Sequence, residues 1–248
     1  MITETVLPSN LPNSTLYNIG DLKIFLHHED LALSVLDTLR HPISVDTELN
    51  RILDYKIGKL CLIQIKGKDS DVRHLVKFDV DKPHNSPVLK QMFENDDIPK
   101  IFHYGRVDLH FISDKLQCTP VNILCTKVAS KIVRGQADNI KHNLHILCDE
   151  LLSIKLDKGE QMSKWENKIL TPSQKFYAAL DVEYLDDIFN ILINREPNLY
   201  DLIMQNCRFY ETLIKNDLSG KDPLDDIPEG LILENQKHGI DLSTLFEH

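Results

Sequence analysis

The sequence predicts an α/β fold in which a mixed β-sheet is flanked by α-helices. The expected elements follow the order strand, helix, three strands, helix, strand, helix, and most of the chain after Pro120 is helical. Three consecutive strands, at 42–49, 59–67 and 72–78, favour antiparallel hairpins. The strand at 100–104 follows a helix and therefore favours parallel addition. A mixed sheet covered by helices satisfies this order.

Hydrophobic periodicity and helix signals define the elements of the N-terminal half. Residues 22–27 read as a short apolar strand, and 29–40 carry apolar residues at helical spacing. Acids in the first turn of that second segment suit the helix dipole. The helix expected at 86–96 has Ser86 as its N-cap and Pro87 at its first position. Prolines and glycines between these segments end the elements.

The remaining segments are an N-terminal arm and the helices of the second half. Residues 1–21 hold prolines, a glycine and several Ser and Asn residues, so we expect an arm without regular structure. A helix after Gly105 carries Asp108 in its first turn. The later helices are expected at 125–134, 142–152, 172–194 and 198–216.

Composition limits the class of protein. The chain has 248 residues, of which 42% are hydrophobic and 27% are charged, which suits one large domain or one domain with a small appendage. It has no apolar run of about 18 residues, and its N-terminus has no signal-peptide pattern, so we expect a cytoplasmic protein without a membrane segment. Five scattered cysteines without a C-x-x-C pair favour buried thiols over disulfides or a zinc site.

The charge of the chain is negative and unevenly spread. The net charge of -10 disfavours an extended groove for long nucleic acids, because phosphate neutralisation usually requires a basic surface. From Arg195 to the C-terminus the sequence has five Lys and Arg residues and eleven Asp and Glu residues, so the last segment is acidic.

Two carboxylates end the most apolar strand. In "ISVDTEL" (43–49), Asp46 and Glu48 are two positions apart and share one face of the strand. Two like charges side by side repel each other, and a half-buried sheet also removes water from them. Their placement raises the question of what compensates them.

Two further acids raise the same question. Asp108 lies in the first turn of a helix, where an acid that complements the helix dipole is a common alternative. Asp181 shares a helix face with Tyr177 and Ile188, and that face otherwise looks core-facing. The alternative for Asp181 is a hydrogen-bonded acid at the edge of this face.

Taken together, the four acids predict a divalent-cation site. Three separate segments would bring carboxylates inward: one with Asp46 and Glu48, one with Asp108, and one with Asp181. Oxygen ligands without a Cys/His set indicate Mg²⁺ or Mn²⁺ rather than zinc. Two such ions roughly 3.5–4 Å apart can activate a water molecule and hold the leaving oxygen of a phosphodiester.

The motifs that carry these acids resemble those of the DEDDy 3′-5′ exonucleases, the ribonuclease D relatives. "VDTE" (45–48), "FHYGRVDL" (102–109) and "YAALD" (177–181) look like the three motifs of that family, in order and with similar spacing. With "CTKVASKI" (125–132) following the second motif, the chain looks closest to the NrnC-type nanoRNases.

The extent of this resemblance suggests how the chain is divided. It covers residues 22–194, the expected exonuclease domain, and leaves 1–21 as the arm. Residues 195–248 form a helical, acidic C-terminal extension that is too short for the tandem helical domains of larger ribonuclease D proteins.

The resemblance also implies a fold and a set of site residues. The fold would be RNase H-like (DnaQ-like), with a mixed sheet of about five strands between helices. Asp46, Glu48, Asp108 and Asp181 would bind two Mg²⁺ or Mn²⁺ ions, and the Tyr177 hydroxyl would orient the attacking water. Trp165 would stack on a base or fill the core. The full set of substrate-binding residues implied is Thr47, Leu49, His103, Gly105 and Trp165.

The function implied by the resemblance is hydrolysis of single-stranded RNA from its 3′ end to nucleoside 5′-monophosphates. Short RNA, down to dinucleotides, suits an acidic chain because a small substrate needs few phosphate contacts. NrnC relatives form octamers, so a homo-oligomer is expected. The alternatives are ribonuclease D-like trimming of structured RNA such as tRNA, a DNA 3′-5′ exonuclease, and a non-catalytic nucleic-acid-binding module. The four intact carboxylates argue against the binding module.

Overall fold

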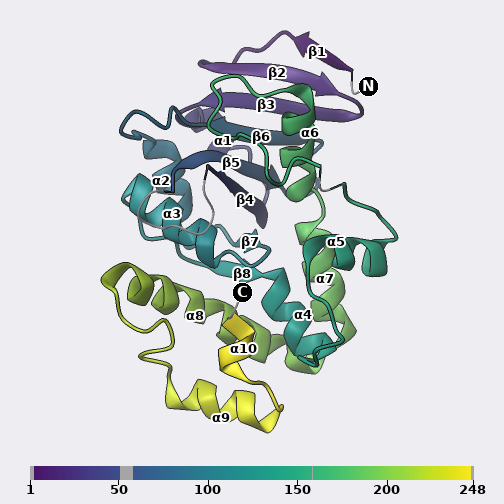
Figure 1. Cartoon of the computed structure of the whole chain (residues 1–248), viewed down its shortest axis with the longest axis vertical. Coiled ribbons are helices and arrows are strands. Elements are labelled where there is room, and N and C mark those ends of the chain that lie inside the picture. Colours follow the sequence, from purple (N-terminus) through teal and green to yellow (C-terminus); the bar gives the residue numbers. More distant parts are fainter. Residues whose placement is uncertain (1–2, 51–57, 158, 247–248) are drawn as a thin grey trace.

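One mixed β-sheet runs through the molecule. The computed structural model describes residues 3–50, 58–157 and 159–246. Within these residues, eight strands pair in the order β1-β2-β3-β6-β5-β4-β7-β8 (Figure 1). The strands are β1 (Glu4–Leu7), β2 (Ser14–Ile19), β3 (Leu22–His28), β4 (Ile43–Leu49), β5 (Leu60–Gly67), β6 (Val72–Lys77), β7 (Lys100–Phe102) and β8 (Ile123–Cys125).

The sheet combines the two kinds of pairing that the sequence predicts. β5 pairs antiparallel with both β4 and β6, so the three consecutive strands form hairpins. β7 adds parallel to β4, β3 adds parallel to β6, and β8 adds parallel to β7. The predicted mixed α/β sheet is confirmed, although eight strands stand where about five were expected.

The prediction that the N-terminal arm has no regular structure is wrong for residues 4–7 and 14–19. They form β1 and β2, and β2 pairs antiparallel with β3 from Ser14↔His27 to Ile19↔Leu22. Apart from the buried Ile19, the side chains of β1 and β2 are exposed or half-buried, which explains the error. Backbone hydrogen bonds hold strands near the edge of a sheet, so such strands need few apolar residues.

Helices cover the sheet and form the C-terminal part of the chain. Figure 1 shows α8, α9 and α10 gathered at the end of the molecule opposite β1. The helices are α1 (Leu33–Leu36), α2 (Pro87–Glu94), α3 (Arg106–Leu116), α4 (Thr126–Arg134), α5 (Leu144–Leu147), a π-helical turn η1 (Cys148–Leu152), α6 (Pro172–Asp181), α7 (Leu185–Arg195), a 3₁₀ turn η2 (Pro197–Leu199), α8 (Tyr200–Ser219), α9 (Glu229–Lys237) and α10 (Leu242–Phe246).

Three predicted helices differ from the structure. The helix expected at 29–40 is reduced to α1, and the one expected at 142–152 is α5 followed by η1. The long helix expected at 172–194 is two helices, because α6 ends at Asp181 and α7 begins at Leu185. The apolar stripe continues across this break, so helical periodicity alone does not reveal it.

Local hydrogen bonds explain where the main helices begin. At α6, the Thr171 side chain accepts a hydrogen bond from the Gln174 amide, and the Gln174 side chain accepts one from the Thr171 amide, so the predicted cap is a complete capping box. At α2, the Asp30 carboxylate accepts hydrogen bonds from two amides of the first turn. Ser86 is the N-cap residue of α2, as predicted, but its side chain donates to the Glu29 carbonyl and makes no cap hydrogen bond.

Apolar side chains pack on both faces of the sheet. The larger cluster includes Val45 and Ile63, and the smaller one joins Leu62 of β5 to Trp165 and the α6 residue Ala178. Leu62 is the register partner of Glu48, so the acidic pair of β4 faces the side of the smaller cluster, beneath α6. All five cysteines are buried free thiols, as expected.

The helices were also compared with the requirements of a membrane span. Among the described residues, none of them combines the length and the apolar character that crossing a bilayer would require.

Candidate active site

The site begins with the acidic pair on β4. Asp46 and Glu48 lie two residues apart on a strand, so both side chains leave the same face of the sheet. β4 pairs with β5, where Gln64 lies opposite Asp46 and Leu62 opposite Glu48. Glu48 is buried, and the register shifts just after it, between Glu48 and Leu49. A pair of acids is therefore fixed at the point where the regular ladder ends.

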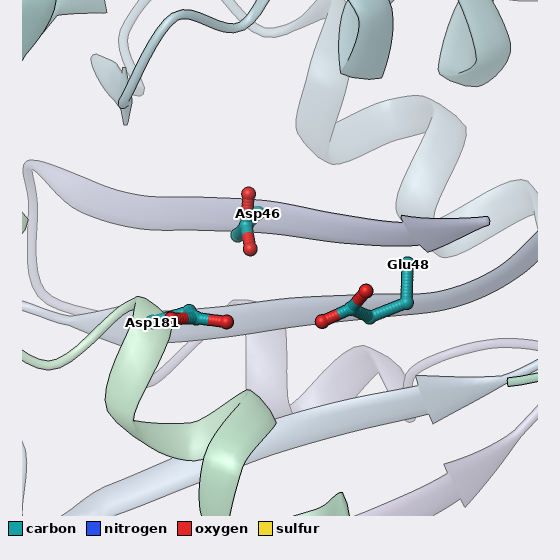
Figure 2. A group of neighbouring side chains, drawn as sticks. All are labelled: Asp46, Glu48 and Asp181. Carbon is teal, nitrogen blue, oxygen red and sulfur yellow. The ribbon is translucent and has the colours of Figure 1, made fainter. Parts of the chain in front are cut away.

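Asp181 completes a group of three carboxylates. It is the last residue of α6, and it offers an oxygen that lies within 4.8 Å of oxygens of Asp46 and Glu48, all three within that distance of one another. Figure 2 shows the carboxylates of Glu48 and Asp181 pointing toward each other, with Asp46 beside the space between them. Tyr177 lies one helical turn earlier, and its hydroxyl donates a hydrogen bond to the Asp181 carboxylate. The spacing that suggested this pairing in the sequence is realised in the helix.

Asp108 lies next to this group. Thr47 Oγ1 donates a hydrogen bond of 2.5 Å to Asp108 Oδ1. Among neighbouring charges, that of Asp108 raises the pKa of Asp46 most, so the two acids lie close together. The structure therefore brings together all four acids that the sequence singled out.

The turn before α3 aims Asp108 at the other acids. Tyr104 has a left-handed backbone conformation, with φ of 63°, and Gly105 follows as the N-cap of α3. A Cβ on Gly105 would lie 2.7 Å from Cβ and Cγ of Phe102, so only glycine fits this contact. The role of Gly105 that the structure supports is the close packing of this turn against β7.

Burial raises the pKa values of all four acids, and repulsion between carboxylates raises those of Asp46 and Glu48 further. Burial, then the charges of Asp108 and Asp181, raises the pKa of Asp46 well above its usual range, and burial with the other three charges does the same for Glu48. Burial raises the pKa of Asp181 to about 7, and the pKa of Asp108 to about 6 despite the hydrogen bond from Thr47. Burial and the neighbouring acids also raise the pKa of Tyr177.

These shifts show that negative charge is unfavourable at the site without a counterion. A divalent cation would supply that counterion, and a donor set made of carboxylate oxygens fits Mg²⁺ or Mn²⁺. The chemistry of Asp46, Glu48, Asp108 and Asp181 therefore fits the metal that the sequence predicts.

Gln64 contacts the site and was missed by the sequence analysis. Its Nε2 donates a hydrogen bond of 3.4 Å to Glu48 Oε1, and the residue is fully buried. Its Oε1 has no partner among the described residues. The signal was present in "CLIQIK", because a polar residue in the middle of a buried apolar strand requires a partner.

Trp165 and Leu49, two of the expected substrate contacts, are buried. Trp165 is 1% exposed and packs against the Tyr177 ring, with ring centroids 6.1 Å apart, so the structure favours the core alternative over stacking on a base. Leu49 is 7% exposed and belongs to the larger apolar cluster. Its expected contact with substrate stays a prediction.

His103 and Thr47 have partners within the chain. His103 Nδ1 lies 2.8 Å from Thr126 Oγ1, and burial lowers the pKa of His103 to about 3, so its imidazole is neutral. Thr47 is also buried, and its hydroxyl is directed to Asp108. Thr47 therefore contacts one of the four acids, and the contacts of Thr47 and His103 with substrate stay predictions.

Comparisons with known proteins agree with this geometry. Residues 25–195 match the model of a family described as 3'-5' exonuclease. Ribonuclease D of Sphingobium indicum is 34% identical over 149 residues, which is 59% of this chain and 36% of that protein. Ribonuclease D of Jannaschia sp. is 30% identical over 151 residues, which is 60% of this chain and 38% of that protein. The chain thus spans well under half the length of these curated relatives.

Solved structures show the same fold. Brucella melitensis NrnC bound to pGG is 29% identical, with a TM-score of 0.72 over 79% of this chain and 94% of that chain. The same protein with bound Mg²⁺ is 28% identical, with a TM-score of 0.71. Escherichia coli RNase D, at 23% identity and a TM-score of 0.63, supports the fold alone.

Proposed function

Because the chain belongs to the 3′-5′ exonuclease family, we propose that it is a metal-dependent exoribonuclease that hydrolyses short RNA from the 3′ end to nucleoside 5′-monophosphates. The observation that carries the proposal is the convergence of Asp46, Glu48 and Asp181 oxygens within 4.8 Å, with Asp108 beside them. Side chains from a strand and two helices meet there although repulsion opposes their meeting.

Each residue of the site has a part in this reaction. Asp46, Glu48, Asp108 and Asp181 would hold two Mg²⁺ or Mn²⁺ ions, which when bound acidify water and stabilise charge on the leaving oxygen. The raised pKa of Tyr177 keeps its hydroxyl protonated, so this group orients the attacking water by hydrogen bonding and does not take its proton.

Two uncharged side chains orient the carboxylates. Gln64 donates to Glu48, and Thr47 donates to Asp108, so each of these two acids is left with one fixed oxygen. An orientation fixed before substrate binds lowers the reorganisation that the reaction requires.

Short RNA is the substrate that the charge of the chain favours. A net charge of -10 suits a substrate with few phosphates, and the NrnC structure bound to pGG supports the same class. The proposal includes assembly into a homo-oligomer, with an octamer as the expected size, and a place in cytoplasmic RNA degradation.

A second candidate is ribonuclease D-like trimming of structured RNA. The matches to ribonucleases D of Sphingobium indicum and Jannaschia sp. favour it, although the chain covers only 36% and 38% of those proteins. A panel containing a dinucleotide RNA, a tRNA precursor and duplex DNA separates the three possible substrates by turnover.

The test is product analysis with 5′-labelled RNAs of two to about ten nucleotides, in Mg²⁺ or Mn²⁺ and in chelator. We expect mononucleotides released from the 3′ end, dependence on metal, and a loss of at least about 10³-fold in Asp46→Ala. Asp187→Asn, which removes an exposed acid of α7, is the matched control. Unchanged hydrolysis by Asp46→Ala would refute the site, and no hydrolysis of any substrate would favour the binding module.

A further inference from the structure

Asp181 occupies a position that its own helix does not favour. It lies at the C-terminal end of α6, where the helix dipole is negative and disfavours a carboxylate. The neighbouring carboxylates of Asp46 and Glu48 on β4 also repel it. The hydrogen bond from Tyr177 orients the Asp181 carboxylate but comes from the same helix. Contacts outside α6 must therefore hold the end of this helix against the repulsion.

An ion triad lies immediately beyond that helix end. Glu183 lies in the break between α6 and α7, and its Oε2 accepts a hydrogen bond of 2.5 Å from Arg73 Nε. The same oxygen forms an ion pair with Arg73 Nη2 at 2.5 Å, and Glu183 Oε1 lies 3.8 Å from Lys66 Nζ. The side chains of Arg73, Glu183 and Lys66 are 8%, 15% and 13% exposed. Arg73 Nη1 also donates to the Asp71 carbonyl at 2.7 Å, which fixes the guanidinium on β6.

The triad shares a sheet face with the catalytic acids. Lys66 of β5 and Arg73 of β6 are register partners, and Gln64 of the same β5 face lies opposite Asp46. Lys66 is two residues from Gln64, which is roughly 7 Å along the strand. The two cations therefore lie one row of side chains from the acid cluster, on the face that α6 covers.

We propose that the triad of Glu183, Arg73 and Lys66 is a positioning device that holds Asp181 over the acids of β4; this rests on the proposed function. Glu183 is two residues beyond Asp181, so its attachment to two strands fixes the backbone at the end of α6. The capping box of Thr171 fixes the other end of the helix. Tyr177 and Asp181 lie between these two anchors, as a preorganised metal ligand and its donor require.

The test compares Mn²⁺ binding, measured by electron paramagnetic resonance, with kinetics on a dinucleotide RNA. Glu183→Gln keeps the size of the side chain and removes its charge. We expect Mn²⁺ binding about tenfold weaker and kcat lowered by about tenfold to a hundredfold, with KM changed by less than about threefold. The double variant Glu183→Arg/Arg73→Glu restores the pair and should recover most of both losses. Asp187→Asn, a nearby exposed acid on α7, should behave as wild type.

The outcomes separate this inference from the function on which it rests. If wild type binds Mn²⁺ and Glu183→Gln binds it equally well with the same kcat, the triad only stabilises the fold and the positioning role is overturned. If Glu183→Gln does not fold, Arg73→Lys, which keeps the charge but loses the fork, must weaken Mn²⁺ binding or the inference fails. If wild type neither binds Mn²⁺ nor hydrolyses RNA, the proposed function itself is overturned.

Discussion

Removing one charge from the acid cluster should stabilise the metal-free protein. The perturbation is Asp181→Asn, which keeps the shape of the side chain and can still accept a hydrogen bond from the Tyr177 hydroxyl. Burial raises the pKa of Asp181 to about 7 from an ordinary 3.8. At about 1.4 kcal/mol per pH unit, keeping this group ionised in the folded state costs roughly 4 kcal/mol at about pH 8.

The sign of the effect follows from where the proton binds. The folded state holds a proton on Asp181 more tightly than the unfolded state, so the contribution to stability is full below about pH 4 and is lost as pH rises through about 7. The variant has no such loss. After a deduction of about 1–3 kcal/mol for an imperfectly bonded buried amide, Asp181→Asn should gain about 1–3 kcal/mol at about pH 8. At about pH 4 wild type is protonated and only the deduction remains, so the variant should be less stable than wild type by about 1–3 kcal/mol.

Thermal unfolding followed by circular dichroism in chelator measures this difference directly. For a chain of this size the expected gain in Tm at about pH 8 is roughly 2 to 10 °C. Millimolar Mn²⁺ should stabilise wild type more than the variant, because binding to the folded state adds to its stability and the variant lacks a ligand. A difference in Tm between variant and wild type that does not change with pH would refute the reasoning.

Two further substitutions probe the site and the turn that aims it. Tyr177→Phe removes the hydroxyl that donates to Asp181, so kcat should fall by about tenfold to a hundredfold with KM nearly unchanged, and equal kcat in steady-state assays would contradict the role of this hydroxyl. Gly105→Ala puts a Cβ 2.7 Å from Phe102 and should lower the free energy of unfolding by about 1–3 kcal/mol in chemical denaturation. Gly230→Ala is its control, because a Cβ there meets nothing within 4 Å and the helix should gain stability.

Short-range patterns carried the correct part of the sequence analysis. The two-residue period of a strand put Asp46 and Glu48 on one face, and the helical period put Tyr177 one turn before Asp181. The cap at Thr171 was also readable, because its donors and acceptors lie within four residues. Each of these features depends on neighbours in the sequence, so the sequence alone is enough to predict it.

Features that depend on distant residues were not predictable in this way. The break between α6 and α7 lies in a segment whose helical periodicity is uninterrupted. Glu183 in this break is bound to Arg73 of β6, which is 110 residues away in the sequence. The composition of β1 and β2 is that of a loop, and they are strands because β2 pairs with β3 and β1 pairs in turn with β2 at the edge of the sheet. Long-range pairing decides all of these, and propensity is a weak guide to it.

The contacts around the acids orient the carboxylates without neutralising them. Within the described residues, the side chains that donate to the carboxylates are uncharged: Thr47 to Asp108, Gln64 to Glu48, and Tyr177 to Asp181. A lysine or arginine in any of these places would neutralise a carboxylate, lower its pKa and occupy the oxygens that a metal requires. Two cations on the same sheet face, Arg73 and Lys66, form ion pairs with Glu183 instead. The chain therefore fixes the orientation of its acids without cancelling their charge, and the repulsion that remains among them is what a divalent cation relieves on binding.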